Sequence, residues 1–523
     1  MLSSTGSASA NAPHISKLMY TRFFLLLMAV LVLCVAPVQA QQTVYVAPDG
    51  SPIGSGSLTS PVGSIATALT RVAPGDTIYV RGGTYASPDL IRIDDSGEEG
   101  NRLHIWAYPG ETPVFDFTGA PRGFDIRGDY LHLKGFVAEN ANDNGVYVKQ
   151  ASYNIIEQVV ARYNGDSGVQ VEDESAHNLL LNVDSYGNYD AGNHGENADG
   201  FAIKFGVGPG NVLRGCRAWG NSDDGYDFWS RDDPGQQGIT VENSWAFNNG
   251  INVWSDTDFQ GDSNGFKLGH GPGAHVLTRN LAWGHLANGF DVNGNLSGVT
   301  LYNNTAYLNG NTNFYFDDDQ NVEQGTSVLR NNLSFGDYRI DQSIADDAFN
   351  TWNSGMPNAR SSDFLSTDDT GADGPRQPDG SLPDIDFLHL APGSDLIDAG
   401  TDVGLPYAGG APDLGAFEVG LDMGTAVAEQ GEVPSTIQLF PNYPNPFNPS
   451  TQLTFEVREM EHLRLSIYNA LGQHVATLID EVRPAGRHTI AWNTANSDLP
   501  NGVYIARLEA ARSSVTQSMI LLK

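Results

Sequence analysis

The chain has 523 residues, and its 62 Asp and Glu against 28 Lys and Arg give a formal net charge of −34. A surface this acidic repels polyanions, so we do not expect nucleic acid as a partner. Charged residues make up only 17% of the chain while glycine reaches 59 residues, which favours β-structure with many turns over helices. The composition therefore predicts a mostly β protein.

The N-terminus carries a basic segment, the apolar run FFLLLMAVLVLCVA and then a short cleavage-site pattern ending at Ala40. This order is typical of an export signal, so we expect residues 1–40 to be a signal peptide. The run is too short and too close to the cleavage site to predict a membrane span, and we expect none in the mature chain. Cleavage also removes Cys34 and leaves Cys216 as the single cysteine, which excludes an intramolecular disulfide.

A repeat organises the next part of the chain. TVYVAPDGS, SIATALTRV and GDTIYVRGGTY predict a strand, a short helix and a strand that cap a larger β-structure. From about Arg102 to Gly336, an Asn/Asp/Ser-Gly pair followed by an apolar residue recurs at intervals of 23, 32, 25, 40 and 24 residues. Short strands at a period in the mid-twenties predict the coils of a parallel β-helix, whereas a propeller would have longer and more even units. The repeated glycines are Gly145, Gly168, Gly200, Gly225, Gly265 and Gly289.

In a β-helix, equivalent residues of successive coils stack about 4.8 Å apart. The residue after each repeated glycine is apolar and is predicted to point into the core, and the next residue is predicted to point outward. The core column is Val146, Val169, Phe201, Tyr226, Phe266 and Phe290. The outward column is Tyr147, Gln170, Ala202, Asp227, Lys267 and Asp291. The turn column, before each glycine, is Asn144, Ser167, Asp199, Asp224, Asn264 and Asn288.

These columns bring four aspartates together. Asp199 and Asp224 fall on neighbouring coils, with Asp223 and Asp227 beside them. Four such carboxylates repel one another unless some are protonated or a cation lies among them. Short oxygen ligands without His or Cys favour a hard ion, so the cluster predicts Ca²⁺. The alternative is that these residues only form turns on an acidic surface.

Lys267 lies between Asp227 and Asp291 in the outward column of a chain that has very few lysines. One interpretation is an exposed salt bridge, which would contribute little to stability. The other is a catalytic base beside a metal. A divalent cation lowers the pKa of a neighbouring amine, whereas free carboxylates raise it, so metal binding would be a condition for catalysis.

The segments ENADGFAIKFG, GNVLRGCRAWGNSDDGYDFW and NGFKLG resemble the core of polysaccharide lyase family 9, which are secreted, pectate-lyase-like enzymes built on a right-handed parallel β-helix. The resemblance covers about residues 144–336. An insertion between Gly235 and Gly261 departs from it, and we expect this insertion to form a loop over the substrate-binding face. The resemblance implies that Ca²⁺ is held by Asp199, Asp223, Asp224 and Asp227 and that Lys267 abstracts the proton. Lys204 and Asn264 are further candidates for contacts with the substrate.

The β-elimination reaction that the resemblance implies suits these residues. In a uronate polymer the C5 proton lies α to a carboxylate, so a metal-bound carboxylate and a lysine base would allow β-elimination. We therefore expect a monomeric enzyme acting on an acidic polysaccharide, either polygalacturonate or rhamnogalacturonan I. One alternative is a glycoside hydrolase that uses Asp223, Asp224 and Asp227, but this leaves Lys267 without a role. Another is a non-enzymatic glycan-binding solenoid that stacks sugars on Trp219, Trp229, Trp245 and Trp254, although these tryptophans also suit packing.

The C-terminal part has a different texture. We expect the β-helix domain to span residues 41–420, a linker to span 421–434 and a small β-sandwich to span 435–523. The segments FPNYPNPFNPST and NGVYIARLEA resemble the C-terminal sorting domain of the type IX secretion system. This resemblance implies export through the periplasm to the outside or the cell surface, with the type IX machinery as a partner.

Overall fold

The computed structural model describes residues 41–230, 235–318 and 323–421, together with most of the segment 437–522. The predicted signal peptide and all but the first residue of the predicted linker lie outside the described residues. No helix in the described part of the chain is long and apolar enough to cross a membrane.

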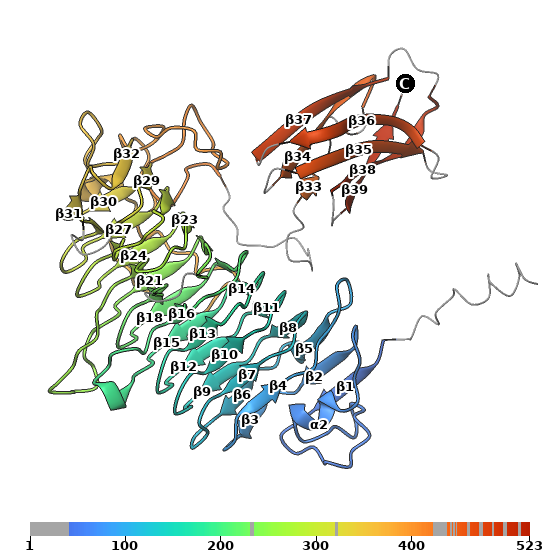
Figure 1. Cartoon of the computed structure of the whole chain (residues 1–523), viewed down its shortest axis with the longest axis vertical. Helices are drawn as coiled ribbons and strands as arrows, with labels where there is room; N and C mark the ends of the chain where they lie inside the picture. Colours follow the sequence, from blue (N-terminus) through green and yellow to red (C-terminus); the bar gives the residue numbers. More distant parts are fainter. Residues whose placement is uncertain are drawn as a thin grey trace, which may run out of the picture.

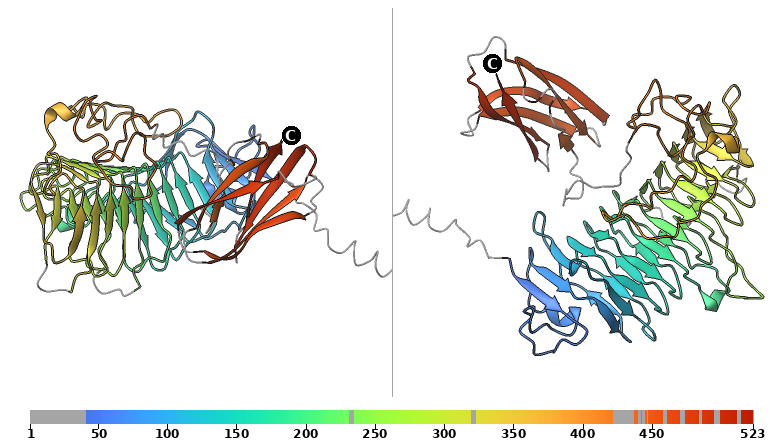
Figure 2. Two further views of the ribbon diagram at one scale, coloured as in Figure 1. Left: turned by 90° about the horizontal axis from the view of Figure 1, so that it is seen from above. Right: turned by 180° about the vertical axis from the view of Figure 1, so that it is seen from behind.

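The N-terminal region is a parallel β-helix, as predicted. Within the described residues the chain winds repeatedly through three parallel sheets of 12, 10 and 10 strands, here called sheets 1, 2 and 3 (Figures 1 and 2). Sheet 1 consists of β1 Thr43–Val46, β2 Thr77–Val80, β5 Leu103–Ala107, β8 Leu131–Lys134, β11 Ile155–Glu157, β14 Leu179–Leu181, β17 Val212–Arg214, β20 Thr240–Glu242, β23 Val276–Thr278, β26 Thr300–Tyr302, β29 Ser327–Arg330 and β32 Ala345–Ala348.

Each complete coil from β2 to β31 contributes one strand to each sheet, and β1 and β32 extend sheet 1 at its two ends. Sheet 2 consists of β4 Ile91–Ile93, β7 Phe124–Ile126, β10 Val146–Lys149, β13 Val169–Glu172, β16 Phe201–Ile203, β19 Tyr226–Asp227, β22 Phe266–Lys267, β25 Phe290–Asp291, β28 Phe314–Phe316 and β31 Tyr338–Ile340. Sheet 3 consists of β3 Gly83–Ala86, β6 Pro113–Asp116, β9 Val137–Glu139, β12 Val160–Arg162, β15 Asp184–Tyr186, β18 Arg217–Trp219, β21 Trp245–Phe247, β24 Leu281–Trp283, β27 Thr305–Tyr307 and β30 Leu333–Phe335.

The N-terminal end has the predicted strand, helix and strand. Helix α2 (Ile65–Leu69) lies between β1 and β2 and begins at Ser64, whose hydroxyl accepts a hydrogen bond from the Thr67 N–H. Its Ile65, Ala68 and Leu69 are buried and join the same hydrophobic core as the coils. The helix therefore closes the end of the core that the first coil would otherwise expose.

Stacked rings fill the core behind sheet 2. The predicted core column continues in register from Phe201 to Phe314, and its neighbouring rings lie 4.5–5.0 Å apart with interplanar angles of 16° or less. All of these rings are fully buried. Their stacking fixes the register of the strands whose next residues point outward.

A ladder of buried side chains lines the turn after sheet 3. The backbone N–H of Asn188 donates to Asn221 Oδ1 (3.2 Å), and that of Asn221 donates to Asn249 Oδ1 (3.0 Å). On the next coil His285 takes the same position, and its Nδ1 accepts the Asn249 N–H at 3.2 Å. Burial lowers the pKa of His285 to about 3, so the ring is neutral and can accept this bond. The ladder satisfies backbone groups that these turns would otherwise leave buried without partners.

Residues 349–421 cover the outer face of sheet 3. Apart from the short 3-10 helix η2 (Ser361–Asp363) this segment is mostly irregular, and its Phe364, Phe387 and Leu396 pack against Trp245 and Trp283. The Trp283 indole N–H also donates to Asp369 Oδ2 (2.8 Å). The sequence predicts that the β-helix domain extends to residue 420, but not that its last segment covers a sheet.

The C-terminal region is the predicted small β-sandwich. Two antiparallel sheets, β33-β34-β37 and β36-β35-β38-β39, enclose a separate hydrophobic core that includes Phe455, Ile467 and Trp492. Its strands are β33 Ile437–Leu439, β34 Ser450–Val457, β35 Glu461–Asn469, β36 His474–Arg483, β37 Gly486–Asn493, β38 Gly502–Glu509 and β39 Ser514–Leu521.

A buried ion-pair network fastens the 349–421 segment to sheet 3. Asp184 accepts bonds from Arg217 Nη2 (2.7 Å) and from Arg376 Nη2 (2.6 Å), and Arg217 Nη1 also donates to the carbonyl of Ala372 (2.7 Å). Although burial opposes its ionisation, the two guanidinium groups hold the pKa of Asp184 below its usual value. The carboxylate is therefore ionised at neutral pH and joins two buried cations.

Asp184→Asn should lower the free energy of unfolding by about 3–5 kcal/mol, because it leaves two buried guanidinium groups without their counter-charge. The matched control is Asp346→Asn, whose exposed carboxylate pairs with Arg330 at 2.9 Å and should contribute less than about 1 kcal/mol. Denaturant unfolding of both variants measures the difference. Equal effects would contradict a structural role for the buried network.

The same network predicts a pH dependence. Because the folded-state pKa of Asp184 is lowered, its stabilisation is complete above the unfolded-chain pKa of about 3.9 and is lost as pH falls through the folded value. The wild type should therefore lose more stability than Asp184→Asn when unfolding is compared at pH 6 and at pH 3.

Candidate active site

The four predicted aspartates and both predicted lysines meet on the outward side of sheet 2. Asp199 precedes β16, Asp223 and Asp224 precede β19, Asp227 lies in β19 and Lys267 in β22. The outward column has the predicted register: Ala202 pairs with Asp227, Asp227 with Lys267, and Lys267 with Asp291.

These side chains are buried although they point away from the core. The four aspartates are 0–4% exposed, and Lys204 and Lys267 are each 8% exposed. This burial argues against two alternatives: that the aspartates only form turns on an exposed surface, and that Lys267 makes only an exposed salt bridge. Burial makes the mutual repulsion of the carboxylates far stronger than it would be in water.

The two lysines divide the carboxylates between them. Lys204 Nζ lies 2.7 Å from Asp227 Oδ2 and 3.1 Å from Asp199 Oδ2. Lys267 Nζ lies 3.1 Å from Asp224 Oδ2 and 2.6 Å from Asp262 Oδ2. Asp262 comes from the segment before β22, and the sequence does not predict its place in the site because the insertion there interrupts the repeat.

Backbone and amide groups fix the orientation of the carboxylates. Asp224 Oδ1 accepts the Asn264 backbone N–H (2.7 Å) and its side-chain Nδ2 (3.0 Å), while Asn264 Oδ1 accepts the Asn288 N–H (3.2 Å). Asp223 Oδ2 accepts the Asn197 N–H (3.0 Å), and its Oδ1 accepts the Asp262 N–H (2.5 Å). Asn264 thus faces Asp224 and the next coil, so its visible task is to orient a carboxylate.

The protonation states follow from burial and from the lysines. Burial raises the pKa of Asp199 to about 8 and that of Asp224 to about 6, because each lysine offsets only part of the desolvation. Burial also opposes the ionisation of Asp227, but Lys204 and Lys267 together lower its pKa below the usual value. For Lys267, burial lowers the pKa while Asp224 and Asp227 raise it, and the carboxylates prevail. Lys267 is therefore an ammonium group while the carboxylates around it are negatively charged.

The donor set fits a hard divalent cation. Carboxylate oxygens of Asp199, Asp224 and Asp227 lie within 4.8 Å of one another, and so do those of Asp223, Asp224 and Asp262. Asp224 Oδ2 is fully buried, and its charge partner among the described residues is Lys267 Nζ at 3.1 Å, which does not meet hydrogen-bond geometry. A buried carboxylate shared by two oxygen clusters is an arrangement that a cation such as Ca²⁺ would complete.

The tryptophans of the glycan-binding alternative differ in their exposure. Trp245 is 4% exposed beneath the 349–421 segment, and Trp219 lies between the rings of Tyr186 (4.2 Å) and Phe247 (5.5 Å). Trp254 stacks on Tyr189 at 4.6 Å. Trp245 is therefore closed to sugars, whereas Trp219, Trp229 and Trp254 are each only partly buried.

Comparisons with known proteins identify the fold family. Residues 44–332 match the family model described as a Pel9A-like, right-handed β-helix region. Pectate lyase L of Dickeya dadantii is 40% identical over 398 residues, which are 73% of this chain and 91% of that protein. These findings show that the chain belongs to the Pel9A-like family and is a polysaccharide lyase.

Solved structures agree. Pectate lyase Pel9A superimposes with a TM-score of 0.68 at 38% identity, covering 73% of this chain and 97% of that structure. A rhamnogalacturonan lyase gives a TM-score of 0.56 at 25% identity over 68% of this chain and 98% of that structure. Residues 442–522 match the secretion system C-terminal sorting domain, which indicates an extracellular or cell-surface protein.

Asn264→Ala should lower the free energy of unfolding by about 1–3 kcal/mol, because it leaves the buried Asn288 N–H and one bond to Asp224 without partners. Asn311→Ala is the control, since the exposed Asn311 donates to the neighbouring Asn288 side chain at 2.8 Å. Thermal unfolding of both variants provides the measurement. If the Asn264 variant were as stable as the Asn311 variant, the proposed role of Asn264 in orienting the Asp224 carboxylate would be contradicted.

Proposed function

We propose that this protein is a calcium-dependent pectate lyase that cleaves a pectic uronate polymer, with polygalacturonate as the preferred substrate. The observation that carries the proposal is Lys267, a buried amine held 3.1 Å from a carboxylate cluster whose oxygens suit a hard cation. The similarity to proteins named pectate lyases supports this substrate, and the more distant rhamnogalacturonan lyase makes rhamnogalacturonan I the second candidate.

Asp199, Asp223, Asp224 and Asp227 would hold the ion. Ca²⁺ bound there would offset their charge and, through the substrate carboxylate, stabilise the negative charge that develops when the C5 proton leaves. Lys267 can act as a base only if a cation lowers its pKa. Without the ion, the surrounding carboxylates keep the pKa of Lys267 raised. Lys204 bridges Asp199 and Asp227, so we propose that it holds these two carboxylates together or contacts the substrate.

The elimination itself needs few groups. Lys267 Nζ takes the C5 proton, a C4=C5 double bond forms and the C4–O glycosidic bond breaks, so that the leaving oxygen departs with the electron pair and is then protonated. No water is added across the bond. One product carries an unsaturated sugar at its non-reducing end, whereas hydrolysis would give none.

The domain organisation suggests a role for each part of the chain. We propose residues 41–420 as the catalytic unit and 435–523 as a sorting module, with residues 1–40 as a signal for passage through the periplasm. The match of residues 442–522 to the sorting-domain model supports recognition by the type IX machinery. We propose that the catalytic unit acts as a monomer.

Lys267→Ala should reduce the formation of unsaturated product from polygalacturonate at least 10³-fold while Ca²⁺ binding is retained, because the general base is lost. The control is Lys134→Ala, a half-exposed lysine in β8 that pairs with Glu157 at 2.7 Å and should leave the rate within twofold. Product absorbance and calorimetric Ca²⁺ titration give the two readouts. An active Lys267 variant would contradict the assigned base.

Asp227→Asn should weaken Ca²⁺ binding at least tenfold, because it removes a charged ligand from an all-oxygen site. Asp317→Asn changes the net charge equally at a carboxylate that pairs with Arg339 and should leave Ca²⁺ affinity unchanged. If Asp227→Asn bound Ca²⁺ as the wild type does, the ion would have to lie elsewhere.

A further inference from the structure

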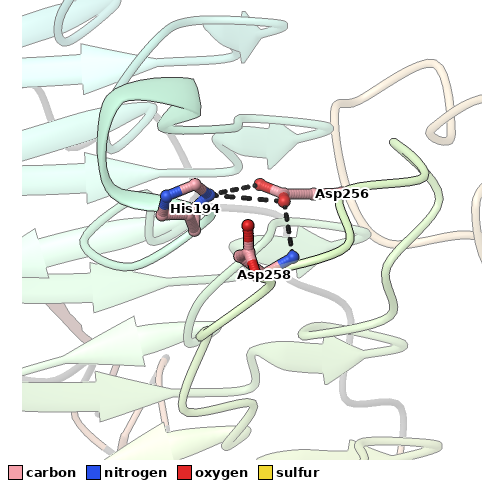
Figure 3. A group of neighbouring side chains, drawn as sticks. All are labelled: His194, Asp256 and Asp258. Carbon is pink, nitrogen blue, oxygen red and sulfur yellow. Dashed lines mark hydrogen bonds and ion pairs between the residues drawn. The ribbon is translucent and has the colours of Figure 1, made fainter.

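A second cluster of metal-ligating groups lies outside the proposed active site. It consists of His194, Asp256 and Asp258, which face one another from two different loops (Figure 3). His194 follows the short 3-10 helix η1 (Ala191–Asn193), and the two aspartates belong to the insertion between β21 and β22. One ligand atom from each residue lies within 4.8 Å of the other two.

The surroundings hold this cluster in place. His194 Nδ1 lies 3.1 Å from Asp256 Oδ2, and Asp256 Oδ1 accepts the Asp258 N–H at 2.9 Å. The Tyr189 hydroxyl donates to Asp256 Oδ2 (2.7 Å), and its ring stacks on Trp254 at 4.6 Å. A hydrogen bond from outside the cluster thus orients a carboxylate, as is common behind metal ligands.

The local charge favours a cation. Two carboxylates lie together here in a chain with a formal net charge of −34. The active-site cations Lys204 and Lys267 pair with other carboxylates. An imidazole nitrogen beside two carboxylates is a ligand set typical of Zn²⁺ or Mn²⁺, whereas Ca²⁺ prefers oxygen ligands alone.

We propose that His194, Asp256 and Asp258 bind a divalent transition-metal ion, with Zn²⁺ as the best fit, that joins the 187–197 loop to the 250–262 loop. This proposal does not depend on the proposed function. Ligands about 2.1 Å from an ion lie about 3.4 Å apart, and the His194 and Asp256 atoms already have this spacing. Asp258 is exposed, and its ligand atom lies within 4.8 Å of the other two, so it would have to move closer to the ion, and water would fill the remaining positions.

The site would have a consequence for the active-site carboxylates. Asp223 is held by one N–H from each loop, those of Asn197 and Asp262, and the Gln260 N–H also donates to the His194 carbonyl at 2.9 Å. An ion that joins the loops therefore restricts the segments that orient Asp223. Metal binding should slow amide exchange in the 250–262 loop.

The test uses the full chain, stripped with a chelator and reloaded with excess Ca²⁺ so that the all-oxygen cluster is filled. Zn²⁺ is then titrated by calorimetry, and Co²⁺ by visible absorbance. His194→Gln and Asp258→Asn should each weaken Zn²⁺ binding at least tenfold, and His194→Gln should change the Co²⁺ spectrum. The control is Glu196→Gln, an exposed acid of the same loop, which should stay within twofold.

Hydrogen exchange provides a second readout. Zn²⁺ should protect the 250–262 amides in the wild type and in Glu196→Gln, but not in His194→Gln. Absence of Zn²⁺ binding by the wild type, or binding unaffected by His194→Gln, would overturn the proposal. Equal weakening by Glu196→Gln and Asp258→Asn would also overturn it, because only diffuse attraction to an acidic surface would remain.

Discussion

The parallel register of sheet 2 is the constraint on which the rest of the structure depends. Strand spacing places equivalent side chains about 4.8 Å apart, and the stacked rings from Phe201 to Phe314 prevent the coils from slipping. A slip of one residue would send Asp227 and Lys267 into the core and the rings outward. The chemistry of the outward face is therefore set by apolar packing on the opposite side of the same strands.

That packing concentrates like charge, and the protein manages the charge in two ways. Lys204 and Lys267 each bridge two carboxylates, while backbone N–H groups and the Asn264 amide hold the remaining oxygens. Even so, burial keeps the pKa of Asp199 and Asp224 raised, because the lysines offset only part of the desolvation. The cluster is thus incompletely compensated by the chain itself, which is the physical basis for assigning it a cation.

The sequence predicts the fold and most of the site because both follow from the repeat. The core, outward and turn columns occur in the predicted register, and the N-terminal cap and the C-terminal sandwich have the predicted strands. Features that depend on insertions or on distant segments could not be predicted. Asp262 reaches Lys267 from an insertion with no repeat to align it, and Arg376 pairs with Asp184 across 192 residues. His285 replaces an asparagine in the ladder, where a neutral ring nitrogen accepts the same N–H.

The central claim, elimination dependent on a cation in the aspartate cluster, is tested most directly by the ultraviolet absorbance of products from polygalacturonate. The enzyme is treated with a chelator and assayed with and without added Ca²⁺, and reducing ends are counted in parallel. We expect absorbance that appears only with Ca²⁺ and rises in proportion to new reducing ends. New reducing ends without absorbance would show hydrolysis, and equal absorbance in the chelated enzyme would show that the cluster needs no ion.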